Sequence, residues 1–108
     1  LDGSSIRVPT PNVSVVDLVF VPKRLTSVDE INRAIIEAAD GRMKGVLSYT
    51  DKPLVSSDFN HDPHSSIFAL KQTQMIDGGL ARILTWYDNE WGFSTRMADV
   101  ALEMGRHL

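Results

Sequence analysis

The sequence contains no cysteine among its 108 residues. Within these residues this excludes disulfide bonds, thiolate metal sites and cysteine nucleophiles, and it leaves the redox compartment open. A large excess of charge of one sign is also missing, because 11 basic and 14 acidic side chains give a formal net charge of -3. Without a basic excess there is no electrostatic reason to expect a nucleic acid or a membrane surface as a partner.

Long hydrophobic runs and phosphate-binding glycine loops are absent as well. No apolar run approaches the roughly 20 residues that a membrane-spanning helix needs. Gly78 and Gly79 lack the GxGxxG spacing and a following helix, so dinucleotide binding cannot be argued from these residues. The start, LDGS, lacks an initiator Met and resembles neither a basic leader nor an apolar signal core. We expect one hydrophobic core, and we expect the chain to be a piece of a longer polypeptide.

The first element is a strand within residues 6–21. Pro9 and Pro11 prevent regular pairing at its start because each lacks an N–H donor, and from Val13 onwards the segment is β-branched and apolar on both faces. A strand of this kind is usually covered on both faces or lies at an interface. Asp17 interrupts it, and a carboxylate there needs a partner, either an arginine or backbone N–H groups.

Two helices follow from capping signals and apolar spacing. Ser27 and Glu30 have the spacing of a capping box, and apolar residues then recur at helical intervals up to Gly41, where we expect a left-handed residue. A second helix is predicted over residues 90–106. Its apolar face comprises Phe93, Met97, Val100, Ala101 and Met104.

The chain between these helices is predicted to form strands and a loop. The expected strands are residues 46–49, 54–56, 67–76 and 80–87. Residues 58–65 are polar and contain a proline, which indicates a loop. The turn DGG before the last strand is typical of a hairpin with positive φ at glycine. The pattern favours an α+β fold with a mostly antiparallel or mixed sheet and two main helices.

Two places could bind a ligand. Arg7 stands beside two prolines, so a guanidinium with little backbone freedom could hold a phosphate; the alternative is an ordinary surface arginine. The run WYDNEWGF at residues 86–93 lies at a strand-to-helix junction, where Asn89 could offer a donor and an acceptor to a ligand amide. The alternative is that Asp88 or Asn89 only caps the helix and that the aromatic residues belong to the core.

The loop NHDPHS at residues 60–65 suggests, at first sight, a metal site. His61, His64, Asp58 and Asp62 are of the ligand types that transition metals accept. A proline breaks any helical spacing, however, and no third histidine or cysteine lies near. A polar loop is the better interpretation, and no serine arrangement supports either histidine as a general base.

Two stretches resemble signature segments of phosphorylating glyceraldehyde-3-phosphate dehydrogenases. They are RVPTPNVSVVDL at residues 7–18 and WYDNEWGF at residues 86–93, and the intervening EAADG (37–41) and PLVSSDF (53–59) fit as well. The resemblance implies that residues 1–108 are part of a C-terminal catalytic domain. It also implies that the NAD-binding Rossmann domain, the nucleophilic cysteine and its histidine lie upstream, so that His61 and His64 are not the catalytic histidine.

The resemblance assigns roles to three residues of this chain. Arg7 matches the arginine that helps bind the C3 phosphate of the substrate, and Asn89 matches the asparagine that hydrogen-bonds the nicotinamide carboxamide. Phe93 stands where many members have tyrosine and could pack near the nicotinamide. No catalytic residue and no metal ligand is expected in this segment. The implied reaction is hydride transfer to NAD followed by phosphorolysis of a thioester.

The family also implies partners and a location. These are a phosphorylated aldehyde, inorganic phosphate, the other subunits of a cytoplasmic homotetramer and, for the final helix, the cofactor domain. The stretch FNHDPHS at residues 59–65 also resembles the erythrose-4-phosphate dehydrogenase branch, whereas Tyr87, where that branch is expected to have cysteine, favours glyceraldehyde 3-phosphate. A hypothesis of another class is a stand-alone interaction or assembly module, motivated by the missing thiol.

Overall fold

The computed structural model describes residues 2–77 and 79–108. In these residues the elements are β1 (Ser14–Phe20), α1 (Val28–Asp40), β2 (Leu47–Thr50), η1 (Ser56–Phe59), β3 (Ser66–Ala69), η2 (Leu70–Gln72), β4 (Gln74–Ile76), β5 (Leu80–Tyr87) and α2 (Trp91–Arg106). The strands form one five-stranded sheet in the order β1-β5-β3-β2, and β4 also pairs with β5. Only β2 and β3 run parallel among these described pairs. The predicted α+β fold with a mixed sheet and two helices is confirmed.

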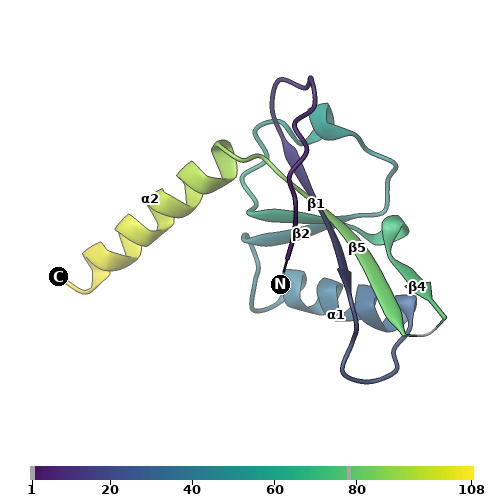
Figure 1. Cartoon of the computed structure of the whole chain (residues 1–108). Coiled ribbons are helices and arrows are strands. Elements are labelled where there is room, and N and C mark those ends of the chain that lie inside the picture. Colours follow the sequence, from purple (N-terminus) through teal and green to yellow (C-terminus); the bar gives the residue numbers. More distant parts are fainter. Residues whose placement is uncertain (1, 78) are drawn as a thin grey trace.

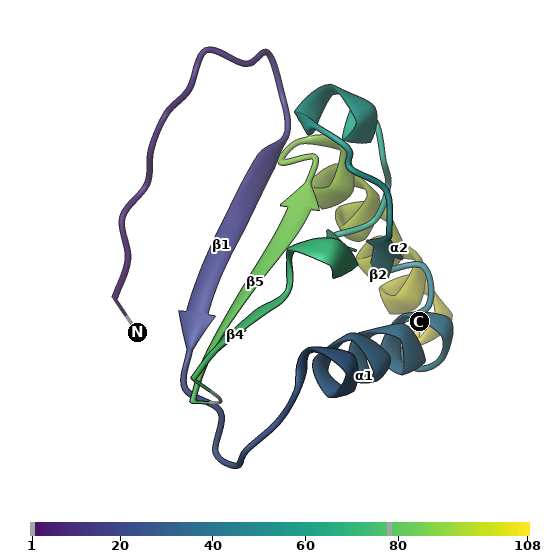
Figure 2. The same ribbon diagram turned by 90° about the vertical axis from the view of Figure 1, so that its right-hand side faces the viewer.

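The two helices take different positions relative to the sheet. α1 lies beside the sheet close to β2, whereas α2 leaves the end of β5 and extends away from it (Figure 1). The chain before β1 runs along the outer side of that strand and turns back into it (Figure 2). Among the described residues, no helix is long and apolar enough to cross a bilayer.

β1 pairs with β5 along its whole length, in antiparallel register from Ser14 opposite Tyr87 to Phe20 opposite Ala81. The Arg82 side chain donates two hydrogen bonds, at 2.8 and 2.7 Å, to the carboxylate of Asp17, which lowers the pKa of that carboxyl. The predicted arginine partner of Asp17 is therefore confirmed, although the pair lies at the surface rather than in the core.

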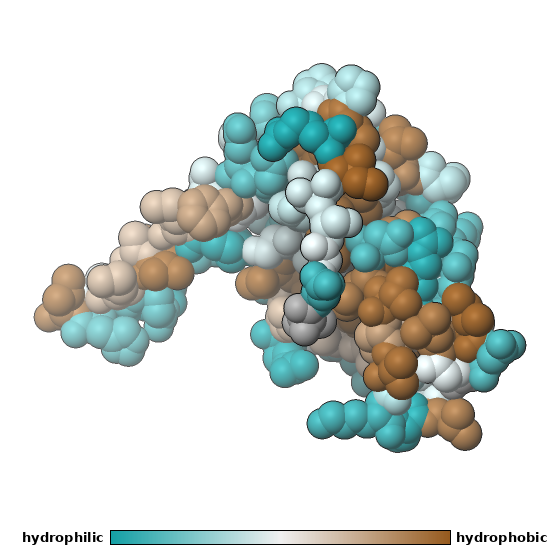
Figure 3. All heavy atoms as spheres, in the orientation of Figure 1, coloured by the Kyte–Doolittle hydropathy of each residue, from teal (hydrophilic) through white to brown (hydrophobic). Residues whose placement is uncertain are grey.

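Neither face of β1 is well covered in this chain. Val15 and Val16 remain 43% exposed and Val19 remains 51% exposed. Apolar side chains gather over this part of the sheet in the space-filling view (Figure 3). Residues 2–77 and 79–108 therefore do not supply the cover that a strand apolar on both faces usually has.

α1 begins as predicted and ends differently. The Ser27 hydroxyl accepts a hydrogen bond from the Glu30 N–H at 3.2 Å, which is half of the predicted capping box. The prediction of a left-handed Gly41 is wrong, since its φ is -110°. Glycine is required there by space instead: a Cβ would lie 2.8 Å from the carbonyl oxygen of Glu37. The left-handed residue in this turn is Gly45, with φ 78°.

Two predicted strands are wrong in part. Residues 54–56 pair with nothing regular and lead into η1, because the Asp58 carboxylate accepts the Val55 N–H at 2.8 Å and bends the chain into a helical turn. Residues 67–76 are divided into β3, η2 and β4. The division coincides with two hydrogen bonds from α1, since the Asn32 amide donates to the Leu70 carbonyl at 3.1 Å and accepts from Thr73 at 2.7 Å.

The hairpin between β4 and β5 is confirmed by their antiparallel pairing. Asp77 in this turn has a positive φ of 47°, and Gly78 lies outside the described residues. Aspartate tolerates this region better than most residues with a side chain.

The hydrophobic core lies where η1 and β3 meet the end of β5. Buried Val13, Phe59 and Ile67 pack with Leu54 and Trp86, and the Trp86 ring stacks on Phe59 at 5.4 Å between centroids. Val13 has φ 72°, a conformation that is unfavourable for a β-branched residue. Its burial at 5% exposure anchors the turn that leads from the proline-containing segment into β1.

Candidate functional site

The two predicted ligand segments meet at one end of the sheet. Because β1 starts opposite the last residue of β5, the residues before β1 lie against those after β5. The Asn12 side chain donates to the Asp88 carboxylate at 2.8 Å, and the Ser14 hydroxyl donates to the Asn89 amide oxygen at 3.4 Å. The structure therefore brings Asn89 together with the end of the segment that carries Arg7.

Asp88 is the most buried polar residue of this junction, at 1% exposure. Its Oδ1 accepts the N–H groups of Glu90 and Trp91 at 3.0 and 2.8 Å. Its Oδ2 accepts the Asn12 amide and the His61 N–H at 2.8 and 2.9 Å. Burial alone would raise the pKa of this carboxyl, but the four hydrogen bonds outweigh burial and hold the pKa below its ordinary value. Asp88 is therefore an ionised carboxylate that joins three segments.

Asn89 stands between Asp88 and the first turn of α2. Its side chain is exposed, and its amide oxygen is directed to Ser14. The sequence left open whether Asp88 or Asn89 caps this helix. In the structure the N-cap position is Glu90, whose side chain makes no capping bond, and the Asp88 carboxylate accepts the N–H groups of Glu90 and of Trp91, the first residue of α2. Asn89 is thus free to offer its amide to a ligand at a fixed backbone position.

Arg7 lies in the extended segment before β1 and is exposed. Among the hydrogen bonds and ion pairs of residues 2–77 and 79–108, none involves its guanidinium. The structure therefore does not place Arg7 against Asn89 directly. It brings only the end of that segment, at Asn12 and Ser14, to the same end of the sheet as Asn89.

The histidine loop contacts the junction. Among the described residues, no group of three or more His, Cys, Asp or Glu side chains is placed to hold a metal ion. The His61 ring stacks on the Trp91 ring with 4.5 Å between centroids, and His64 Nδ1 lies 2.7 Å from the Asp62 carboxylate. The polar-loop interpretation is consistent with these contacts, because each histidine is occupied by a neighbour.

The aromatic residues of the junction divide between core and surface. Trp86 belongs to the core, whereas Trp91 is 48% exposed and Phe93 is 66% exposed. Phe93 begins an apolar groove of about 320 Å³ along one face of α2. The groove is lined by Phe93, Arg96, Met97, Val100, Ala101 and Met104.

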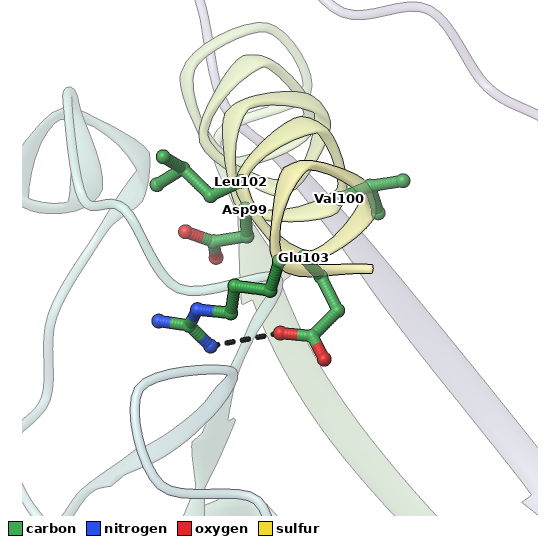
Figure 4. Close-up of a pocket in the computed structure, with 5 residues that line it drawn as sticks. Asp99, Val100, Leu102 and Glu103 are labelled. Atoms are coloured by element: carbon green, nitrogen blue, oxygen red, sulfur yellow. Dashed lines mark hydrogen bonds and ion pairs between the residues drawn. The ribbon is translucent and has the colours of Figure 1, made fainter. Parts of the chain in front are cut away.

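A second hollow lies on the C-terminal half of α2 and is lined by Asp99, Val100, Leu102, Glu103 and Arg106. Its charged side chains pair along the helix, with Arg106 and Glu103 2.8 Å apart (Figure 4). Each hollow has one helix as its only wall, so neither encloses a ligand by itself.

Sequence reasoning missed Asn12 and underestimated Asp88. Asn12 was part of the recognised motif, but nothing in its local spacing predicts a contact with a residue 76 positions later. For Asp88 the available signal was an aspartate three residues before the first apolar residue of a helix, which predicts a capping carboxylate but not its two long-range partners.

The class of protein follows from a comparison with known families. Residues 1–89 match the family described as "Glyceraldehyde 3-phosphate dehydrogenase, C-terminal domain", and the chain belongs to this family.

Individual relatives bear the corresponding name. The chain is 67% identical over 108 residues to "Glyceraldehyde-3-phosphate dehydrogenase" of Cereibacter sphaeroides, covering 100% of this chain and 32% of the relative. It is 64% identical over 106 residues to the protein of the same name from Xanthobacter flavus, covering 98% and 32%. The Zymomonas mobilis protein is 59% identical over 109 residues, covering 100% and 32%. The chain thus spans about a third of the length of these relatives, and the resemblance of its motifs is confirmed.

Proposed function

We propose that this chain is the C-terminal part of a glycolytic subunit that oxidises glyceraldehyde 3-phosphate to 1,3-bisphosphoglycerate with NAD and inorganic phosphate. Membership of the family supports the reaction. The observation that carries the role of this chain is the Asn12–Asp88 hydrogen bond of 2.8 Å, because it joins the segment of the phosphate arginine to that of the nicotinamide asparagine.

Arg7 binds the C3 phosphate of the substrate in this proposal. Its guanidinium is exposed, and the prolines that follow restrict the backbone around it. A guanidinium presents parallel N–H groups that match two phosphate oxygens, which makes such a contact both strong and directional.

Asn89 orients the nicotinamide. The group fits the residue, because an exposed amide with a hydrogen-bonded oxygen still has N–H groups for the carboxamide of the ligand. When bound, NAD supplies the acceptor for the hydride of the aldehyde carbon. Phe93, in the first turn of α2, offers the nicotinamide an apolar surface but no hydroxyl group.

The remaining parts of the active site belong to the rest of the subunit. The chain has no cysteine, so the nucleophile, its histidine and the Rossmann domain are proposed to precede these residues. The apolar groove of α2 suits the cofactor domain, and the uncovered faces of β1 suit the contacts of a cytoplasmic homotetramer.

A chimeric subunit tests the proposal. The part of the Cereibacter sphaeroides relative that precedes the matching region is joined to this chain, and the kinetics of R7A, N89A and the control R33A are measured. Arg33 is an exposed arginine of α1, so R33A removes the same charge elsewhere. We expect R7A to raise KM for glyceraldehyde 3-phosphate about 10- to 100-fold, since a hydrogen bond to a charged group contributes about 1.5–3 kcal/mol.

The other variants complete the test. N89A should weaken NAD binding, whereas R33A should change neither KM for glyceraldehyde 3-phosphate nor the affinity for NAD. Equal changes of both constants in R7A, or an unchanged NAD affinity in N89A, would contradict the assignments. A higher kcat/KM for erythrose 4-phosphate than for glyceraldehyde 3-phosphate would place the chain in the other branch.

The interaction-module hypothesis differs in what it predicts for the chimera and agrees in what it predicts for the chain alone. The 108-residue chain alone should show no dehydrogenase activity under either hypothesis, because it lacks the thiol, and activity would contradict the proposed mechanism. A folded chimera that is inactive, next to an active Cereibacter sphaeroides enzyme, would favour the module.

A further inference from the structure

A buried carboxylate links the two halves of the proposed ligand site. Each oxygen of Asp88 serves a different part of the chain: Oδ1 serves the first turn of α2, and Oδ2 serves Asn12 and the loop at His61. Because Asp88 is 1% exposed, its carboxylate makes these hydrogen bonds with little competition from water.

The bonds at Oδ1 fix the backbone around Asn89. The N–H groups of Glu90 and Trp91 both point back to the residue that precedes Asn89, at 3.0 and 2.8 Å. The Asp88 carbonyl also accepts the Gly92 N–H at 3.1 Å. Asn89 therefore lies in a turn that is closed by hydrogen bonds from the three residues after it to Asp88.

The bond from Asn12 to Oδ2 fixes the segment before β1. Asn12 also donates to the Asn60 side chain at 2.9 Å, and the following residue is the buried, positive-φ Val13. Arg7 is exposed and lies upstream in the same segment, with two prolines between it and Asn12. Beside the Ser14–Asn89 hydrogen bond and the pairing of β1 with β5, Asn12 thus ties the chain that carries Arg7 to the carboxylate that precedes Asn89.

The histidine loop at residues 60–65 contacts the Asp88 carboxylate as well. His61 donates its N–H to Oδ2 at 2.9 Å, and its ring stacks on Trp91, whose own N–H is bound to Oδ1. The loop therefore contacts the Asp88 carboxylate and the first residue of α2 at once, which holds the start of the helix on the sheet.

We infer that Asp88 is a positioning residue that couples the phosphate-binding segment to the nicotinamide-orienting asparagine, through Asn12 on one side and the first turn of α2 on the other. This inference rests on the proposed function. Asp88 touches neither ligand itself, and it sets the relative position of Arg7 and Asn89. Losing Asn12 should release the phosphate side only, whereas losing Asp88 should release both sides.

The test uses the chimeric subunit and four variants: N12A, D88A, the double variant N12A/D88A and the control D29N. Asp29 is an exposed carboxylate in the first turn of the other helix, α1. The readouts are KM for glyceraldehyde 3-phosphate, the dissociation constant of NAD by titration calorimetry, and Tm.

We expect N12A to raise KM for the aldehyde about tenfold, by the loss of one buried charge-assisted hydrogen bond, while the NAD dissociation constant changes less than about twofold. D88A should raise both constants, and N12A should add nothing further in the D88A background, because the connection passes through Asp88. D29N should change neither constant. If D88A does not fold, D88N replaces it, since an asparagine still offers one oxygen to the helix N–H groups.

Two results would overturn the inference. One is a lower Tm in N12A and D88A with both constants unchanged, which would make Asp88 a purely structural residue. The other is an additive effect of N12A and D88A on KM for glyceraldehyde 3-phosphate in the double variant. Both results can be told apart from a failure of the proposed function, because the kinetics of R7A and N89A test that function independently.

Discussion

Gly92 provides a prediction whose sign depends on a single close contact. A Cβ at this position would lie 2.9 Å from the carbonyl oxygen of His64 and 3.6 Å from its carbonyl carbon. That carbonyl cannot yield easily, because the His64 N–H is bound to Asp62 at 2.9 Å and the Ser65 N–H is bound to Val46 at 2.8 Å. Gly92→Ala therefore has to displace α2 from the histidine loop.

The magnitude follows from two opposing effects. Replacing glycine by alanine in a compatible helical conformation stabilises a protein by about 0.4–1 kcal/mol, since it reduces the entropy of the unfolded chain. Overpacking against a fixed neighbour costs about 1–3 kcal/mol. We expect Gly92→Ala to be destabilising by roughly 1–2 kcal/mol overall.

Thermal unfolding of the chimeric subunit measures this difference, with Gly105→Ala as the matched control in the same helix. A Cβ at Gly105 meets nothing within 4 Å, so this change should leave Tm unchanged or raise it slightly. Gly92→Ala should lower Tm by about 2–8 °C. It should also weaken NAD binding, because Asn89 lies in the turn that leads into the displaced helix. If Gly92→Ala raised Tm as Gly105→Ala does, the reasoning from the close contact would be refuted.

Two further predictions concern the stability of the same subunit. Phe68→Ala should be destabilising by about 3–5 kcal/mol, since Phe68 is 2% exposed, and a loss below about 1 kcal/mol in urea unfolding would show that its site collapses around the gap. A hydrogen bond from Arg24, assisted by Thr26, lowers the pKa of Glu30 from 4.5 to about 2, so its stabilisation is fully present above about pH 4.5 and is lost as the pH falls through about 2. The difference in Tm between wild type and E30Q should accordingly be constant above pH 4.5 and shrink towards pH 2, and a difference that is independent of pH would contradict the pairing.

The sequence predicted elements whose signals are local. The helix from Val28 follows from a serine cap and apolar spacing, and β5 and α2 follow from uninterrupted periodicity, so their existence and type are confirmed. The short strand at 54–56 and the continuous strand at 67–76 were wrong for one physical reason. Side-chain hydrogen bonds with Asp58 and Asn32 reshape the backbone there, and apolar periodicity carries no information about them.

The candidate site was predictable to the same extent. The motif gave Asn89 and Arg7 as candidates, and the helix-start pattern gave Asp88 or Asn89 as a possible cap. The juxtaposition with Asn12 and His61 depends on strand register, because it exists only when Ser14 lies opposite Tyr87. A shift of that register by one residue would turn Ser14 to the other face of the sheet and separate it from Asn89.

The central position of β5 has a consequence for the rate of folding. This strand pairs with β1, β3 and β4, and its pairing with β1 joins residues as far apart as Ser14 and Tyr87, 73 positions along the chain. Contacts of such high sequence separation require a large loop to close before they yield any stabilisation, whereas β4 and β5 are successive strands and can pair early. We therefore expect the docking of β1 onto the hairpin of β4 and β5 to limit the rate at which this sheet forms.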